Sequence, residues 1–221
     1  MGSGPLLSPA PAIVIFDLDN TLVHSRIDFL GIRTAIIARL VEVGALAEAP
    51  ADPRAHAIAE WLDMAHAHDP RLAAELWDVV DQFERDGMVH GTVEAEARCT
   101  LDRLREAGLR LAVLTNNSIG SAEAALDRFE LRAPFDLVLA RERVRALKPA
   151  GDGVAEAHAR LGRGATYVVG DAYIDGLATE RANVGAKFIA FRGNLADMLR
   201  RGVTPWASVQ SLAEIPRLLG I

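Results

Sequence analysis

The segment Ile13–Val23 contains the residues whose types and spacing are best suited to chemistry. Its four leading apolar residues, which are mostly β-branched, predict a buried strand that ends at Asp17. Asp19 follows two positions later, and alternate side chains of an extended chain lie on one face, so both carboxylates can point into one site. Close carboxylates perturb each other's ionisation unless a cation lies between them. This strand end is therefore a candidate for metal-assisted catalysis, and the alternative is an Asp-rich turn that caps a helix.

Other polar residues also follow predicted strands. Thr115 and Asn116 come after the apolar run 109–114, and Asp171 comes after the run 166–169. Strand patterns alternate with helical patterns in this part of the chain, which predicts an α/β fold with a parallel sheet covered by helices on both faces. Ligands of such folds bind beyond the carboxyl ends of the strands. We therefore expect these sequence-distant groups to converge on one crevice.

A different pattern occupies the region between the first and second strands. Three helical patterns lie there, and no convincing strand interrupts them. Two of the helices open with Asp-Pro, a capping residue followed by proline at the first helical position, at Asp52 and Asp69. The last is predicted to end at Gly87. These patterns predict a disordered lead-in over residues 1–11, a catalytic core over residues 12–25 and 91–221, and an inserted all-helical domain over residues 26–90.

Composition excludes several classes of protein. The formal net charge of −6 argues against a nucleic-acid backbone as the main partner. A single cysteine, Cys99, allows neither an intramolecular disulfide nor a multi-cysteine zinc site. No apolar run approaches the roughly 20 residues that span a bilayer, and the N-terminal stretch lacks the features of a signal peptide. We expect a cytoplasmic protein without a membrane or nucleic-acid partner, present as a monomer or homodimer.

Four motifs carry a family resemblance. Residues Asp17-Leu18-Asp19-Asn20-Thr21 resemble the first motif of the haloacid dehalogenase-like hydrolase superfamily, and the match continues through Thr115-Asn116, Lys148-Pro149 and Gly170-Asp171-Ala172-Tyr173-Ile174-Asp175. All four occur in the family's order and at compatible separations. The resemblance is to the phosphoglycolate phosphatase-like branch. It implies a Rossmann-like core with a helical cap that closes over the site and contacts the leaving group.

The resemblance also implies roles for individual residues. Asp17 would be the nucleophile that forms an aspartyl-phosphate, and Asp19 would donate a proton to the leaving oxygen and later accept one from water. The branches that act on substrates other than phosphate esters lack this second aspartate, so its presence favours a phosphate ester. Lys148, the Thr115 hydroxyl and the backbone N–H of Asn116 would bind the transferring oxygens.

The implied cofactor is Mg²⁺, which prefers hard oxygen ligands. By the family pattern, Asp17 and Asp171 bind it through their side chains and Asp19 through its backbone carbonyl. Asp175 would support the metal shell or hold Lys148. One departure is Ala172, where many relatives have Ser or Thr, so one hydrogen bond near the metal is expected to be missing.

These observations favour a Mg²⁺-dependent phosphatase that acts on a small phosphorylated metabolite. A sugar phosphomutase resembling β-phosphoglucomutase shares the motifs and stays open. A non-enzymatic phospho-aspartate switch also stays open, although the second acid beside Asp17 and the helical insert oppose it. His24 and His90 flank the insert, and either contact with the leaving group or a structural role is compatible with their positions.

Overall fold

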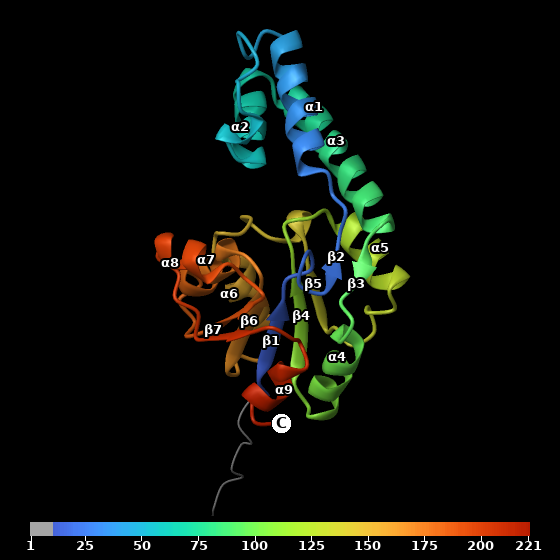
Figure 1. The fold of residues 1–221 in the computed structure, drawn as a ribbon, viewed down its shortest axis with the longest axis vertical. Helices are drawn as coiled ribbons and strands as arrows, with labels where there is room; N and C mark the ends of the chain where they lie inside the picture. Colours follow the sequence, from blue (N-terminus) through green and yellow to red (C-terminus); the bar gives the residue numbers. More distant parts are fainter. Residues whose placement is uncertain (1–10) are drawn as a thin grey trace, which may run out of the picture. The chain divides into compact units, whose positions relative to one another are not determined.

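A computed structural model describes residues 11–221 of the chain. The predicted disordered lead-in, apart from Pro11, lies outside the described residues. The chain forms two compact units: a core unit, which runs through His24 and resumes at Thr92, and a helical unit over Ser25–Gly91. Each unit has its own set of secondary-structure elements (Figure 1).

The core unit is built on a six-stranded sheet in the order β5-β4-β1-β6-β7-β8, in which every neighbouring pair is parallel. This confirms the predicted α/β class with a parallel sheet. β1 lies in the interior of the sheet between β4 and β6, and all four of its residues are fully buried, as their continuous apolar character predicts. The strands are β1 (Ile13–Phe16), β4 (Arg110–Leu114), β5 (Leu137–Leu139), β6 (Thr166–Gly170), β7 (Lys187–Phe191) and β8 (Ala207–Val209).

Helices cover both faces of this sheet (Figure 1). Alternate residues of β1, Ile13 and Ile15, belong to a core cluster that also contains Val154 of α6 and Ala178 of α7. Helices α4 and α5 lie on the other side of the sheet in Figure 1. The helices of the core unit are α4 (Ala97–Glu106), α5 (Ile119–Arg128), α6 (Asp152–Arg160), α7 (Tyr173–Arg181), α8 (Leu195–Arg200) and α9 (Glu214–Leu218), together with a 3₁₀ turn, η2 (Arg141–Arg143).

The helical unit consists of α1 (Phe29–Glu42), the 3₁₀ turn η1 (Pro53–Ala55), α2 (Ile58–His68) and α3 (Pro70–Val89). The expected helix end at Gly87 is wrong, because α3 continues to Val89. Gly87 is instead a point of close approach: a Cβ atom built there would lie 2.6 Å from the backbone of Ile27. Glycine is needed here because Ile27 packs directly against the helix, and the backbone at Gly87 stays helical.

Two short strands that the sequence pattern does not reveal flank the helical unit. β2 (Val23–His24) and β3 (Thr92–Val93) form an antiparallel pair with His24 opposite Thr92. Two residues are too few to show a periodic pattern, which explains why these strands escape prediction. Across the described part of the chain, none of the helices combines the length and the apolar character that crossing a bilayer requires.

Candidate active site

Three neighbouring strands of the sheet deliver the predicted site residues. Asp17 follows β1 directly, Thr115 follows β4, and Asp171 follows β6. β1 pairs with β4 on one side and with β6 on the other, in parallel, so the carboxyl ends of all three strands meet at one edge. Side chains from three distant parts of the sequence thereby share one location.

The turn after β1 is tight and is closed by its own backbone. The N–H groups of Leu22 and Val23 both donate to the carbonyl oxygen of Leu18, and Asn20 adopts a left-handed conformation with φ of 59°. Asparagine tolerates this region better than most residues, since its short side chain bonds locally. Thr21 is completely buried in the turn, and its hydroxyl donates to Oδ2 of Asp17 at 3.4 Å. The same turn carries Asp19, which is half-buried.

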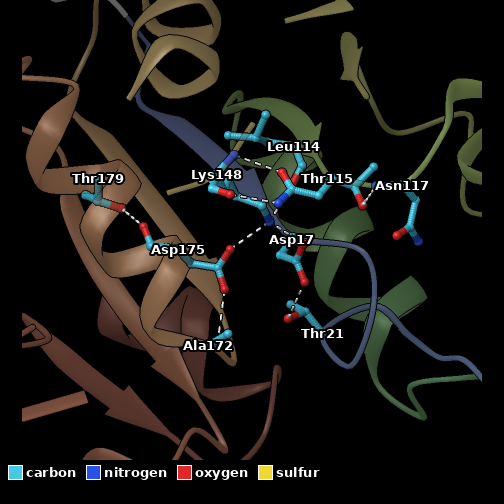
Figure 2. A network of polar contacts seen from close by, with 10 residues as sticks. Asp17, Thr21, Leu114, Thr115, Asn117, Lys148, Ala172, Asp175 and Thr179 are labelled. Carbon is cyan, nitrogen blue, oxygen red and sulfur yellow. Dashed lines mark hydrogen bonds and ion pairs between the residues drawn. The ribbon is translucent and has the colours of Figure 1, made fainter. Parts of the chain in front are cut away.

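Lys148 connects the strand ends (Figure 2). Its ammonium donates to Oδ1 of Asp17 at 2.5 Å, to Oδ1 of Asp175 at 2.7 Å and to the carbonyl oxygen of Leu114 at 3.0 Å. A lysine ammonium has three N–H donors, so each of them has a partner. The lysine and both aspartates are buried, which makes this a desolvated ion-pair network.

Asp175 lies in the first turn of α7 and uses both of its carboxylate oxygens. Oδ1 accepts from Lys148, and Oδ2 accepts from the backbone N–H of Ala172 at 3.1 Å. Gly170 makes room for this carboxylate, because a Cβ built there would lie 2.4 Å from the Asp175 carboxyl carbon. Asp175 thus contacts Lys148, and one of its carboxylate oxygens also lies within 4.8 Å of oxygens of Asp17 and Asp171.

Burial dominates the ionisation of this site. It raises the pKa of Asp17 to about 8, with the neighbouring Asp175 and Asp171 adding to the rise and Lys148 opposing it. Burial also raises the pKa of Asp171 to about 6, with further contributions from Asp175 and Asp19. For Lys148 burial favours the neutral amine, but Asp17 and Asp175 outweigh it and hold the pKa above its usual value. One ammonium thus faces more carboxylates than it can neutralise.

The acidic side chains fit a divalent cation. Oxygen atoms of Asp17, Asp171 and Asp175 lie within 4.8 Å of one another. Carboxylate oxygens are the ligands that Mg²⁺ prefers, and a bound cation would favour the ionised forms of Asp17 and Asp171, which burial and the neighbouring carboxylates disfavour. Asp19 is close enough to influence the pKa of Asp171.

The loop after β4 holds Thr115, Asn116 and Asn117. Thr115 is buried, and its hydroxyl oxygen accepts the N–H of Asn117 at 3.2 Å. The side chain of Asn116 bonds to the main chain of Lys148, a contact that the sequence did not indicate. The side-chain nitrogen of Asn117 is buried and has no hydrogen-bond partner among the described residues. Lysine and asparagine side chains in irregular loops give no periodic signal, so only the fold reveals these relationships.

A second polar cluster, which sequence reasoning missed, ties β2 to the end of β7. Glu94 is buried and accepts hydrogen bonds from the Nη1 and Nη2 groups of Arg192, at 2.8 and 3.0 Å. Nε2 of His24 lies 2.6 Å from the same carboxylate. Burial alone would raise the pKa of Glu94, but the hydrogen bonds from His24 and Arg192 outweigh it and lower the pKa. His90 instead contacts the carbonyl oxygen of Asp86, at 2.9 Å.

Comparison with known proteins identifies the family of the chain. The family model for haloacid dehalogenase-like hydrolases matches residues 11–183. The chain belongs to this family. This haloacid dehalogenase-like hydrolase is 31% identical to a protein of Dickeya dadantii named "Probable phosphatase IndB", over 92% of the chain and 91% of that relative. It is 27% identical to a phosphoglycolate phosphatase of Cereibacter sphaeroides, over 80% of the chain and 84% of the relative.

A solved structure shares the fold. The crystal structure of a hydrolase of the same superfamily from Geobacter sulfurreducens, subfamily IA, aligns with a TM-score of 0.62 at 24% identity. The alignment covers 96% of this chain and 98% of that one. The predicted family and the predicted enzyme class are therefore confirmed.

Proposed function

We propose that this hydrolase is a phosphatase that cleaves a phosphate monoester of a small metabolite through an aspartyl-phosphate at Asp17. One observation carries the proposal: the Asp17 carboxylate lies at the end of an interior strand, bonded to a buried lysine and within 4.8 Å of an Asp171 carboxylate oxygen. A carboxylate that attacks phosphorus divides one difficult displacement into two easier ones. Relatives named as phosphatases support the same chemistry.

The proposed reaction proceeds in two balanced steps. In the first, an Asp17 oxygen forms a bond to phosphorus, the bond from phosphorus to the leaving oxygen breaks, and Asp19 gives that oxygen a proton. In the second, Asp19 takes a proton from water as the water attacks phosphorus, the bond to Asp17 breaks, and phosphate departs. Asp17 and Asp19 return to their starting states, and the net reaction adds one water to one phosphate ester.

Lys148 supplies fixed positive charge to both steps. Its ammonium lies against the attacking carboxylate, so it favours the ionised form of Asp17 and reduces repulsion from an incoming phosphoryl group. Thr115 is buried at the adjacent strand end and is proposed to bind a transferring oxygen. Asp175 holds the ammonium from the opposite side.

Asp17 and Asp171, with the backbone carbonyl of Asp19, are the proposed ligands of Mg²⁺, and Asp175 supports this shell. When bound, the cation neutralises charge on the phosphoryl oxygens. The close approach of the Asp17, Asp171 and Asp175 carboxylate oxygens, which lie within 4.8 Å of one another, motivates this assignment. The helical unit over Ser25–Gly91 is proposed to act as the family's cap, which selects the leaving group.

The test is release of inorganic phosphate from p-nitrophenyl phosphate and from 2-phosphoglycolate, with Mg²⁺ present. Phosphoglycolate is included because several relatives carry that name. We expect wild-type turnover, its reversible loss on chelation, and its abolition in Asp17→Asn. The matched control is Asp127→Asn, since Asp127 is an exposed aspartate on α5. Full activity of Asp17→Asn would rule out Asp17 as the nucleophile, and phosphate returned to a sugar instead of to water would indicate a phosphomutase.

A further inference from the structure

The side chain of Asn116 forms two hydrogen bonds with the main chain of Lys148. Its side-chain nitrogen donates to the carbonyl oxygen of Lys148 at 2.8 Å, and its side-chain oxygen accepts the backbone N–H of the same residue at 2.9 Å. A carboxamide presents one acceptor and one donor group side by side, so it matches the donor and the acceptor of a single residue. Both polar groups of the Lys148 main chain are therefore engaged by one side chain.

Residues at and just after the end of β4 thereby bind both ends of Lys148, its ammonium and its main chain. Leu114, the last residue of β4, accepts a hydrogen bond from the Lys148 ammonium at 3.0 Å. Asn116, two residues further on, holds the main chain at the other end of the same lysine. Lysine has a flexible four-carbon stem, so its ammonium is placed reliably only when its backbone is also fixed.

We infer that Asn116 is a positioning residue, whose side chain fixes the backbone of Lys148 so that the ammonium reaches Asp17. This inference rests on the proposed function, in which Lys148 assists transfer of the phosphoryl group to Asp17. It differs from the role that the family resemblance implies for Asn116, which uses only its backbone N–H. The side chain of Asn116 bonds to the Lys148 main chain, so the inferred action of this side chain is on the position of Lys148.

A purely structural role makes different predictions. If Asn116 only stabilised the loop after β4, its removal would lower the melting temperature and leave the ammonium of Lys148 in place. If Asn116 positions Lys148, removal of the Asn116 side chain exposes and misplaces the Lys148 ammonium. Turnover should then fall only in a protein that still has this ammonium. Two measurements separate these two roles. One measures the turnover of variants, and the other measures the chemical accessibility of Lys148 and needs no turnover.

The turnover measurement is a double-mutant cycle. We expect Asn116→Ala to lower kcat by roughly 10- to 100-fold with little change in KM, because a misplaced donor weakens transition-state contacts more than ground-state binding. In the Lys148→Ala background the same substitution is expected to change kcat by less than about 3-fold, since residues that act as a unit are not additive. Equal effects of Asn116→Ala in both backgrounds would overturn the inference.

The second measurement needs no turnover and exploits the composition of the chain. Lys148 and Lys187 are its two lysines, and Lys187 is exposed whereas Lys148 is buried. Acylation with acetic anhydride, followed by mass spectrometry of peptides, therefore reports on Lys148 with Lys187 as an internal reference. We expect Lys148 to be protected in the wild type and to be acylated at least several-fold faster in Asn116→Ala, with no change at Lys187. Unchanged protection of Lys148 would contradict the inference.

Asn183→Ala is the control for loss of stability alone. Asn183 has a left-handed conformation with φ of 52° after the end of α7, so alanine is strained there and the melting temperature should fall. Its kcat and its Lys148 acylation are expected to match the wild type. If the wild type released no phosphate at all, the proposed function would fail, whereas the acylation rates would still decide whether Asn116 fixes Lys148.

Discussion

The ammonium nitrogen of Lys148 lies 2.5 Å from Oδ1 of Asp17, although 131 residues separate the two in the chain. Oδ1 of Asp175 lies 2.7 Å from the same nitrogen. Both carboxylates and the lysine are buried, so their charges are compensated mainly by one another. The cost of removing one member of this network is therefore set by the charge that remains unpaired.

Lys148→Met is expected to lower both stability and turnover. Removal of one partner of a buried ion pair costs about 3–5 kcal/mol in the free energy of unfolding, since the remaining charge has no compensation. Loss of a fixed donor to the transferring group costs about 10²–10³ in kcat. The stability loss should be smaller near pH 5 than near pH 8, because Asp17, whose pKa burial raises to about 8, is protonated and uncharged at the lower pH.

Urea unfolding and phosphate release measure the two effects. Lys187→Met is the matched control, since Lys187 is exposed and its ammonium lies 4.6 Å from the ring centre of Trp206. An exposed cation–π contact contributes about 0.5–1 kcal/mol, so this control should lose little stability and no activity. Similar losses in the two variants would contradict the network described for Lys148.

Mg²⁺ is expected to bind more tightly as the pH rises from about 6 to about 8. The pKa of Asp171 is raised to about 6 and that of Asp17 to about 8, so both carboxyls bind protons in the metal-free protein at the acidic end of this range. A cation binds the carboxylates and releases those protons, so its apparent affinity increases with pH and levels off above the higher pKa.

Thermal unfolding with and without Mg²⁺, repeated across this pH range, tests whether the affinity for Mg²⁺ rises with pH. The stabilisation by Mg²⁺ should be larger at the alkaline end, since a ligand that binds the folded state more tightly adds more to its free energy of unfolding. Asp171→Asn should reduce the stabilisation at every pH. An affinity that falls with rising pH would be incompatible with metal binding by Asp17 and Asp171.

Gly87→Ala and Gly120→Ala are expected to have opposite effects on stability. An added Cβ at Gly87 would lie 2.6 Å from the backbone of Ile27, whereas a Cβ at Gly120 has nothing within 4 Å. Both glycines lie in helices, α3 and α5. Overpacking against backbone should cost about 1–3 kcal/mol at Gly87, and the better helix propensity of alanine should gain up to about 1 kcal/mol at Gly120.

Urea unfolding of the two glycine variants provides the comparison. Because Gly87 belongs to the helical unit and Gly120 to the core unit, circular dichroism should also show whether the helical unit unfolds first in Gly87→Ala. A Gly87→Ala protein as stable as the wild type would show that Ile27 moves aside at no cost.

Glu94→Gln should destabilise the protein much more than Glu156→Gln. Glu94 is buried and receives two hydrogen bonds from Arg192, while Glu156 forms an exposed i,i+4 pair with Arg160 at 3.2 Å. Hydrogen bonds to charged groups contribute about 1.5–3 kcal/mol, and exposed ion pairs contribute about 0–1 kcal/mol. Unfolding in urea at neutral pH measures the difference, and equal small losses would show that Arg192 readily finds other partners.

The three strands that carry the site were predictable from local pattern. Apolar runs that end in a polar residue identified β1, β4 and β6, and the parallel-sheet rule then placed Asp17, Thr115 and Asp171 at one edge. Lys148 could not be found in this way, because it follows no strand. It was predicted as a site residue only because Lys148-Pro149 resembles a motif of the family. The paired strands β2 and β3 are too short to have a detectable period.

Contacts between distant side chains were the part that sequence could not provide. The Glu94–Arg192 pair joins residues 98 apart, and nothing in either local sequence indicates a partner. The hydrogen bonds of Asn116 to Lys148 depend on how two irregular loops meet. Gly87 was interpreted from its type as a helix end, whereas its environment shows that Ile27 requires the space. Residue type indicates what a position can do, and packing determines which option is used.

The place of β1 in the sheet has a consequence for how the chain reaches its native state. β1 leaves the ribosome first among the strands, but its partners β4 and β6 are synthesised only after the whole helical unit. Non-local pairing is slow compared with local helix formation, so a fully apolar strand waits unpaired while helices form downstream. Such a segment is exposed to aggregation during synthesis, and we expect the yield of folded enzyme to depend on chaperones that shield it.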